Sequence, residues 1–293
     1  MLAVLSPAVR ARPVSTPPQA AFRRLLVASL AVLAGCDGTP GADAADGTPI
    51  DVTSAEGDGT DGGDVDDAED VHVPFDSGTV SISGNAFRFG PPGGFVAGAE
   101  ITVLEHSGLL AVTDDDGAFR IDGVPAWRDA TLILNHPDHP PIQTGTFGTV
   151  VEPLDQVTFQ APTREVFEFM ASLVGVTPDP ARCQIGSTVT RVGGSLYGPG
   201  GSHGETGATV TIEPAVPAEQ GPIYFNLVSA DVIFPDPALT ETTEDGGVLF
   251  VNVEPGEYVL AAHKAGMTFT PARVLCRAGF LVNASPPWAL QGQ

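Results

Sequence analysis

The stretch TDDDGAFRIDGV, residues 113–124, places three carboxylates directly before a glycine and an apolar run. A second stretch, TTEDGGVLFVNV at residues 242–253, repeats the order of threonine, acidic residues, glycine and aliphatic residues. The spacing from Asp116 to Val124 equals that from Asp245 to Val253. One explanation should therefore hold for both stretches, either a metal site or a turn that leads into a strand.

Both stretches are predicted to be tight turns. Asp-Gly is a dipeptide typical of hairpin turns, because glycine adopts positive φ without steric cost and aspartate tolerates it while bonding to nearby backbone. A calcium site needs about six or more converging oxygen atoms. The second stretch offers only Glu244 and Asp245 before its glycines. After the first turn, Phe119 and Ile121 are predicted to enter the core, with Arg120 outside.

The segments around these turns show the two-residue period of half-buried strands. AEITVLE at 99–105 and ATVTIEP at 208–214 both alternate aliphatic and polar residues, and each precedes one of the turns. Each turn is followed by a further strand-like segment, TLIL at 131–134 or YVLAA at 258–262. The chain is therefore predicted to be all-β and to contain two copies of one β unit.

The order Gly-Ala-x-aliphatic-x-aliphatic, then threonine and acidic residues before glycine, then GVP or VEPGEY, resembles the carboxypeptidase regulatory-like domain. The resemblance implies transthyretin-like, Greek-key β-sandwich domains of the carbohydrate-binding-like fold class, at residues 77–161 and 183–293. VPAWRD departs from the family's Pro-Gly-aromatic corner, which leaves the placement of Trp127 open. The zinc-ligand motif of the peptidases is absent from the sequence, so the resemblance implies an accessory module.

The segment TREVFEFMASLVGV at 163–176 has apolar residues at helical spacing and is predicted to be a short amphipathic helix. Thr163 can cap its start and Pro178 ends it. An exposed apolar stripe would promote association, so the helix is predicted to pack against a sandwich, within a linker of residues 162–182. The alternative is a helix that docks a partner.

Residues 1–35 are predicted to be a bacterial lipoprotein signal peptide. Arg23 and Arg24 precede LLVASLAVLAGC, whose apolar run is shorter than the ~20 residues that span a bilayer and suits a signal-peptide core. The run ends in residues 33–36, which resemble the lipobox of bacterial lipoproteins, where the cysteine is lipidated and the chain is cleaved before it. The resemblance implies that Cys36 is lipidated. An unmodified cysteine after a chance apolar run is the alternative.

A lipidated cysteine after a signal peptide predicts that the chain is exported to the cell envelope and is attached to the membrane by its lipid. The outer membrane or the cell surface is favoured as the location. In some of the lipoproteins that this sequence resembles, an aspartate after the cysteine, as at Asp37, is linked to retention at the inner membrane. The periplasmic face of the inner membrane therefore stays open as an alternative.

Residues 36–76 are predicted to form a disordered acidic tether. Residues 37–76 contain 11 Asp and 2 Glu with no Lys or Arg, so the segment can bury little apolar surface and repels itself. A calcium-binding loop beginning at Asp58 would place Gly62, which has no side-chain oxygen, at a ligand position. The formal charge of the whole chain is −23, which disfavours nucleic acid or an anionic bilayer surface as a partner.

The chain has three cysteines. With Cys36 taken by the lipid, Cys183 and Cys276 remain in an exported chain, where oxidising conditions favour disulfides. A disulfide between them, near the two ends of the second sandwich, is predicted. Two buried free thiols are the alternative.

Three other groups of residues are candidates for a functional site. GGSHG at 200–204 matches the G-x-S-x-G pattern of a hydrolase nucleophile through Ser202, but a strand follows it where the pattern requires a helix. His136 and His139 in NHPDHPP could bind a metal weakly, although the prolines favour a surface loop. Aromatic side chains that could stack on a sugar, or equally fill a core, are Trp127, Tyr197, Tyr224 and Trp288.

These observations predict an exported, lipid-anchored, noncatalytic surface protein whose β-sandwiches act as binding or scaffolding modules. No catalytic residue, metal site or cofactor is predicted. The expected partners are the membrane, through the lipid, and an envelope protein or glycan. A carbohydrate-binding module is the first alternative, and a hydrolase that uses Ser202 is the second.

Overall fold

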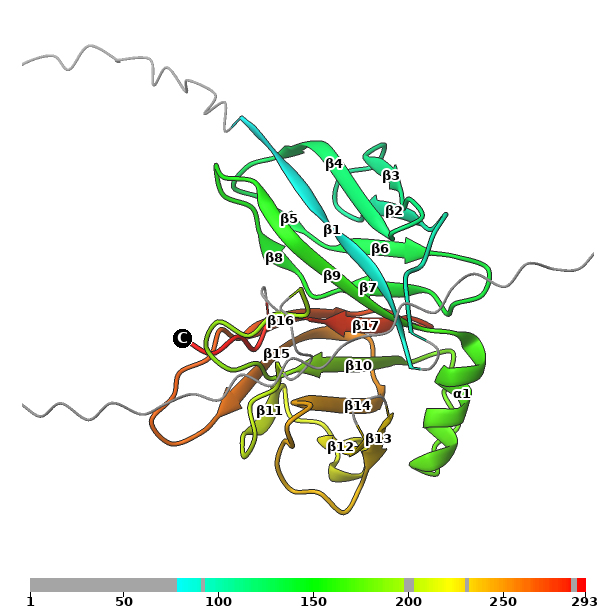
Figure 1. Cartoon of the computed structure of the whole chain (residues 1–293), viewed down its shortest axis with the longest axis vertical. Coiled ribbons are helices and arrows are strands. Elements are labelled where there is room, and N and C mark those ends of the chain that lie inside the picture. Colours follow the sequence, from blue (N-terminus) through cyan, green and yellow to red (C-terminus); the bar gives the residue numbers. More distant parts are fainter. Residues whose placement is uncertain (1–77, 91–92, 198–202, 230–231, 286–288) are drawn as a thin grey trace, which may run out of the picture. The chain divides into compact units, whose positions relative to one another are not determined.

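The computed structural model describes residues 78–90, 93–197, 203–229, 232–285 and 289–293. Within these residues the protein is built mostly of strands, with one α-helix and one short 3-10 helix (Figure 1), so the all-β prediction is confirmed. No helix of this part of the chain is both long and apolar enough to cross a membrane. The predicted signal peptide and tether, at 1–35 and 36–76, lie outside the described residues and stay predictions.

Nine strands form the first copy of the β unit. They are β1 (Thr79–Phe89), β2 (Glu100–Val103), β3 (Leu110–Val112), β4 (Ala118–Pro125), β5 (Asp129–Ala130), β6 (Leu132–Asn135), β7 (Ile142–Thr144), β8 (Phe147–Gly148) and β9 (Leu154–Pro162). The helix α1 (Arg164–Leu173) follows, and then the second copy. Its elements are β10 (Cys183–Thr188), β11 (Thr209–Glu213), the 3-10 helix η1 (Ala218–Gln220), β12 (Ile223–Ser229), β13 (Val232–Asp236), β14 (Gly247–Val253), β15 (Gly256–His263), β16 (Ala272–Cys276) and β17 (Leu281–Ala284).

The strand pairing of the first copy is repeated in the second. β1 pairs antiparallel with β4 and parallel with β9, and β10 pairs antiparallel with β14 and parallel with β17. Likewise β6 lies between β2 and β7, just as β15 lies between β11 and β16, with antiparallel pairing throughout. Six strands of each copy therefore pair in the same way, as the predicted duplication of one β unit requires, whereas the pairs β2–β3 and β12–β14 each occur in one copy only.

The first acidic stretch is a turn, as predicted, and the threonine that begins it ties three segments together. The Ala99 N–H donates to the Thr113 hydroxyl at 2.8 Å, and this hydroxyl donates to the Val96 carbonyl at 2.7 Å. Asp114 accepts hydrogen bonds from two N–H groups of its own turn. Gly117 adopts φ +66°. The carboxylate of Asp114 therefore stabilises backbone, which is the role that a turn requires.

The second acidic stretch has the same construction. The Ala208 N–H donates to the Thr242 hydroxyl at 2.9 Å, and this hydroxyl donates to the Glu205 carbonyl at 2.5 Å. Gly246 adopts φ +76°, and a Cβ atom there would lie 2.2 Å from the Val189 carbonyl oxygen. Only glycine fits this position, because both the φ angle and the close approach exclude a side chain.

Two three-stranded sheets pack on one large sheet, and β5 and β8 form a separate two-stranded sheet. The large sheet has nine strands in the order β13-β12-β14-β10-β17-β7-β6-β2-β3 and runs through both copies (Figure 1). The sheet β4-β1-β9 and the first-copy part of the large sheet enclose one hydrophobic core. The sheet β11-β15-β16 and the second-copy part enclose the other. Each copy is therefore a β-sandwich, and one layer of each sandwich belongs to the shared sheet.

Strand β17 contributes to both cores. Leu281 belongs to the first core and Val282 to the second. Asn283 accepts a hydrogen bond from the Gln160 N–H, on β9, at 2.6 Å, so it faces the same way as Leu281. Because successive side chains of a strand point to opposite faces, the two smaller sheets pack on opposite faces of the large one.

The two copies join where β17 pairs in parallel with β7. Gln143 of β7 is fully buried and donates to the Leu275 carbonyl at 2.6 Å. The exposed Arg273 guanidinium adds two hydrogen bonds to Asp129, at 2.7 and 2.8 Å. The copies thus share a sheet, and division into separate domains at 77–161 and 183–293 stays a prediction.

The helix predicted at 163–176 is present as α1. The Val166 N–H donates to the hydroxyl of Thr163, the N-cap, at 3.3 Å. Met170 and Val174 pack on the outer face of the second sandwich, as predicted. The hydrophobic residues that they contact there are Ile223, Phe225, Leu249 and Val251.

We expect Thr242→Val to lower the free energy of unfolding by about 1–3 kcal/mol, because it leaves the Ala208 N–H and the Glu205 carbonyl without their buried partner. Thr113→Val should have the same effect in the first copy. Thr209→Val, at an exposed position of β11, is the matched control and should change stability by less than ~0.5 kcal/mol. Chemical denaturation measures all three. Equal effects at Thr242 and Thr209 would contradict the role of the buried hydroxyl.

Candidate functional site

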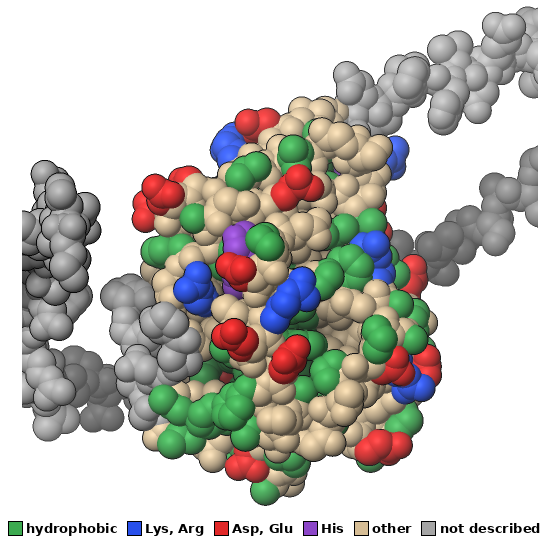
Figure 2. Space-filling model, turned by 90° about the vertical axis from the view of Figure 1, so that its right-hand side faces the viewer, with side chains coloured by type: hydrophobic (Ala, Val, Ile, Leu, Met, Phe, Trp, Pro, Cys, Tyr) green, Lys and Arg blue, Asp and Glu red, His purple; other side chains and the backbone are tan. Residues whose placement is uncertain are grey.

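Two adjoining hollows lie where the first copy, α1 and the second copy meet. Their volumes are about 430 and 340 Å³, and they share Pro141 and Arg164 as lining residues. Both volumes fall within the ~300–1,000 Å³ that is typical of ligand sites. We call the two hollows together the Arg164 groove. Figure 2 shows the side of the molecule that carries α1, where histidine, basic, acidic and hydrophobic side chains border one another.

The first wall of the groove is the proline-rich loop at 135–141. The backbone N–H of Arg164, the first residue of α1, donates to the Asp138 carbonyl at 3.0 Å. The Arg164 Nε donates to the Pro137 carbonyl at 3.2 Å. Prolines restrict the backbone, and these two bonds fix the loop to the helix. The groove therefore has a defined shape on this side.

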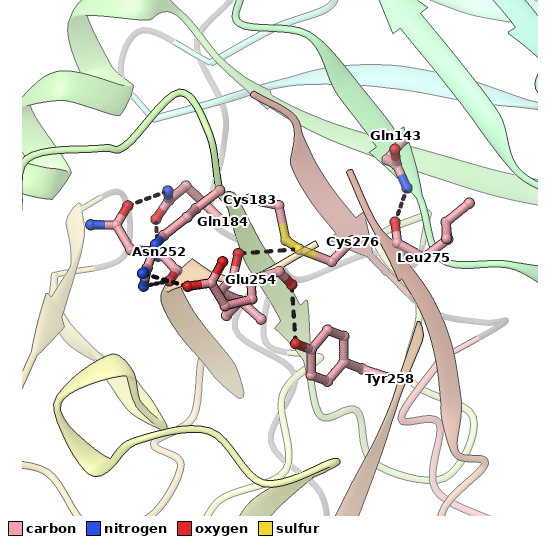
Figure 3. Close-up of a disulfide and its surroundings, with 10 residues drawn as sticks. Gln143, Cys183, Gln184, Asn252, Glu254, Tyr258, Leu275 and Cys276 are labelled. Atoms are coloured by element: carbon pink, nitrogen blue, oxygen red, sulfur yellow. Dashed lines mark hydrogen bonds and ion pairs between the residues drawn. A yellow bond between two sulfur atoms is a disulfide. The ribbon is translucent and has the colours of Figure 1, made fainter. Parts of the chain in front are cut away.

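The second wall is the loop before β10, and Asn252 holds it. The Asn252 side chain donates to the Thr177 carbonyl at 3.0 Å and accepts from the Asp179 N–H at 2.9 Å. It also accepts from the Gln184 side chain at 2.8 Å (Figure 3). Arg182 donates to the Asn252 carbonyl at 3.1 Å. This network holds a proline-rich loop that would otherwise have no regular partner.

His139 lines the smaller hollow and is only 1% exposed. Its Nδ1 lies 2.8 Å from the Pro162 carbonyl oxygen, which can only accept, so Nδ1 carries the hydrogen and Nε2 has a free lone pair. Nε2 has no hydrogen-bond partner among the described residues. Burial lowers the pKa of His139, and the charges of His136 and Arg88 lower it further against the opposing effects of Pro162 and Asp138. These effects favour the neutral form of the imidazole.

The charges of the groove are mixed in sign. Arg164 is exposed and forms no ion pair with any carboxylate in the described part of the chain, whereas Arg182 pairs with Asp179 and Glu254. Glu100 and Glu168 line the two hollows. The guanidinium of Arg277 lies 4.3 Å over the ring of Phe280, a residue of the larger hollow. The Arg164 groove thus combines donors, acceptors and an aromatic wall.

A third hollow, of about 490 Å³, is acidic. It contains Glu105, Asp129, Glu213 and Glu257 together with Arg273. The hydrogen bonds from Arg273 hold the pKa of Asp129 below its usual range. No three His, Cys, Asp or Glu side chains in the described ranges are arranged to hold a metal ion. A group of carboxylates alone defines no ligand, so the Arg164 groove is the better candidate site.

The predicted disulfide joins Cys183 and Cys276, with 5.7 Å between their Cα atoms (Figure 3). Cys183 begins β10 and Cys276 ends β16, so the bond links the two layers of the second sandwich. Both cysteines are buried in the second core. Cys183 also stands between Arg182 and Gln184, which line the larger hollow. The crosslink is therefore adjacent to the candidate site.

The histidines of NHPDHPP lie together, but one of them differs from the prediction. The ring centroids of His136 and His139 are 5.2 Å apart. The His136 Nδ1 accepts from the Asp138 N–H at 3.2 Å. A surface loop was the expectation for both residues, yet His139 is buried, and its Nδ1 bonds to the Pro162 carbonyl at the end of β9.

The remaining predicted residues do not assemble into a site within the described part of the chain. Tyr224 is buried in the second core, where its hydroxyl accepts from the Val210 N–H at 3.0 Å. Tyr197 packs edge-on against Phe87 at 5.4 Å, and Trp127 is 52% exposed. These rings therefore form no shared stacking platform. Cys36, Ser202 and Trp288 lie outside the described residues.

The residues of the groove that sequence analysis missed are Arg164, Asn135 and Phe280. Asn135 belongs to NHPDHPP and Arg164 to the predicted helix segment, but neither segment alone indicates a binding role for these two residues. The signal that was available is the pair of proline-rich segments, NHPDHPP and TPDP, at 135–141 and 177–180. Each segment by itself predicts only a loop or the end of a helix, and only the fold brings the two to one groove.

Neither a family model nor a curated protein sequence matches the chain. Similar solved structures include a type II cohesin–X-dockerin complex from Acetivibrio cellulolyticus, at 20% identity and a TM-score of 0.22 over 26% of this chain and 52% of that one. The Bacillus anthracis TIE protein shares 12% identity at a TM-score of 0.24, over 71% of this chain and 33% of that one. The minor pilin GBS52 of Streptococcus agalactiae shares 10% identity at a TM-score of 0.23, over 73% and 95%. This chain thus spans about half of the first protein and a third of the second, and identities and TM-scores this low assign neither a family nor a function.

We expect loss of the disulfide to lower the free energy of unfolding by about 2–5 kcal/mol, because it closes a long loop in the unfolded chain. The sequence separation of the two cysteines is 93 residues. A Cys183→Ala/Cys276→Ala double variant and the reduced wild type should lose similar stability in chemical denaturation. Cys36→Ala serves as the control for removing a cysteine. A double variant as stable as the wild type would contradict the structural role of this bond.

We expect acid to destabilise the protein through His139. The folded state lowers the pKa of His139. Below the ordinary pKa of about 6.5, the unfolded state therefore binds more protons than the folded state does, and stability decreases as the pH decreases. His139→Gln keeps a donor for the Pro162 carbonyl but cannot titrate. The decrease in melting temperature from about pH 7.5 to about pH 5 should therefore be larger for the wild type than for the variant. An equal fall in both would show that His139 is not the titrating group.

Proposed function

We propose that this protein is an exported, lipid-anchored, noncatalytic protein of the cell envelope that binds a ligand in the Arg164 groove. The observation that carries this proposal is the groove itself. Two adjoining hollows of ligand size lie between two proline-rich loops that are each fixed by hydrogen bonds. A preformed cavity with a few polar groups and a buried residue of shifted pKa is the usual form of a binding site.

The noncatalytic assignment is supported by the residues that line the groove. His136 and His139 are neighbours there, but no serine or cysteine is among the described lining residues. Nucleophilic catalysis by a serine or a cysteine needs that side chain within reach of a base. The charged side chains of the groove can donate or accept hydrogen bonds to a polar ligand, and they are Arg164, Arg182, Glu100, Glu168 and Asp179.

The anchor is supported by the sequence before the described residues. Residues 1–35 would direct export, Cys36 would carry the lipid, and residues 36–76 would hold the folded part away from the membrane. A flexible chain of this length has an end-to-end distance of roughly 35 Å. The resemblance to the carboxypeptidase regulatory-like domain, the division into sandwiches at 77–161 and 183–293 and the linker at 162–182 belong to this proposal. An outer-membrane or cell-surface location is favoured in it.

We expect Cys36→Ala to release the protein from the membrane fraction and to abolish labelling by a radioactive fatty acid. Firm anchoring needs more than one acyl chain, and a lipidated N-terminal cysteine would supply them. Cys183→Ala/Cys276→Ala is the matched control, because it removes the other cysteines and should leave both partitioning and labelling unchanged. Detergent-dependent partitioning that persists in Cys36→Ala would refute the anchor.

The same preparations test the noncatalytic assignment. We expect the wild type to hydrolyse an activated ester, p-nitrophenyl acetate, no faster than Ser202→Ala does. Turnover that depends on Ser202 would overturn the proposal in favour of a hydrolase.

A further inference from the structure

We infer that the ligand of the Arg164 groove is an oligosaccharide, held by hydrogen bonds from its hydroxyl groups to Arg164, Asn135, Glu100 and His139. This inference rests on the proposed function, because it takes the same groove as the binding site. It adds the chemical class of the ligand and the residues that recognise it.

The polar groups of the smaller hollow match hydroxyl groups better than they match an ion. Arg164 only donates hydrogen bonds, an ionised Glu100 only accepts them, and Asn135 does both. All three are exposed, and Glu100 pairs with Asn135 across β2 and β6. A sugar hydroxyl both donates and accepts, so neighbouring hydroxyls of one ring can satisfy such a mixed set. Because the set contains charges of both signs, it favours a neutral ligand.

His139 supplies the second, independent observation. The residue lines this hollow and is only 1% exposed, and its Nε2 lacks a partner among the described residues. Since Nδ1 donates to Pro162, the unused Nε2 is an acceptor. A buried acceptor without a partner is unfavourable. A ligand hydroxyl brings the hydrogen that this atom lacks once a small shift of the loop at 135–141 uncovers Nε2, whereas a carbonyl or a carboxylate brings no hydrogen.

The larger hollow offers a different surface. Phe167 and Phe280 are half-buried in its wall, and four prolines from the two proline-rich loops complete it. The C–H face of a pyranose packs well on such apolar and aromatic surfaces. The two hollows adjoin at Arg164, so a ligand with polar edges and apolar faces in successive units fits both. The arrangement favours at least two linked sugar rings.

Competing classes of ligand fit less well. A polyanion such as nucleic acid would meet Glu100, Glu168 and Asp179 in the same groove, and it needs a basic footprint. A metal ion would need a third ligand, and no such group of side chains is present in the part of the chain that the structure describes.

The test uses the full-length protein in a detergent without a sugar headgroup, so that the detergent cannot compete. The probes are the neutral hexasaccharides cellohexaose, xylohexaose, maltohexaose and chitohexaose, titrated by calorimetry. Arg164→Gln and Asn135→Ala remove groove contacts. Arg128→Gln is the matched control, because Arg128 is also exposed and lies outside the groove. Circular dichroism melting confirms that each variant is folded.

We expect at least one of the probes to bind the wild type. Arg164→Gln should weaken binding about tenfold or more, because a charge-assisted hydrogen bond is lost. Arg128→Gln should change the dissociation constant less than about twofold. Failure of all four probes, or equal weakening by Arg164→Gln and Arg128→Gln, would overturn the saccharide assignment. If the probes fail while Cys36-dependent anchoring persists and no ester is turned over, only the ligand class is wrong and the proposed function stands.

Discussion

The parallel pairing of β17 with both β10 and β7 is the constraint on which the rest of the molecule depends. This pairing joins strands of the two copies into one sheet, and successive side chains of β17 pack in different cores. A shift of one residue would exchange Leu281 and Val282 between faces, so both cores would lose a fitting side chain at once. The register of this four-residue strand therefore couples the packing of the two sandwiches. It also places residues 279–281 in the wall of the larger hollow.

The repeated unit could be predicted from the sequence because it is local. TDDDG and TTEDGG contain the turn glycine, and the alternating strands beside them show which face is buried. The shared sheet could not be predicted in the same way. β17 reads LVNA and is buried at all four positions, so it lacks the alternation that reveals a half-buried strand. β7 has the sequence IQT, and its glutamine is buried, whereas a polarity pattern predicts a glutamine at the surface. The role of Thr113 and Thr242 was also missed, because a buried hydroxyl that links two other segments leaves no periodic signal.

The candidate site could be predicted from the sequence less well than the fold could. Its two loops, at 135–141 and 177–180, are separated by β7, β8, β9 and α1. The helix was predicted correctly, but the sequence does not show that Arg164, its first residue, donates to the Pro137 carbonyl across the groove wall. The prolines around His139 predict a surface loop, but the residue is buried, and its partner at the end of β9 is distant in the sequence. The disulfide was the exception among the site residues, because it followed from counting the cysteines of a chain that was predicted to be exported, which needs no geometry.

The disulfide and one wall of the Arg164 groove both lie at the beginning of β10. Cys183 is crosslinked to β16, and its neighbours Arg182 and Gln184 both bond to Asn252. Asn252 in turn holds the loop that forms one wall of the groove. A binding surface gains affinity when it is ordered before the ligand arrives, because less conformational entropy is lost on binding. The crosslink anchors the strand that carries this wall, so an oxidising compartment would strengthen the same framework that shapes the groove.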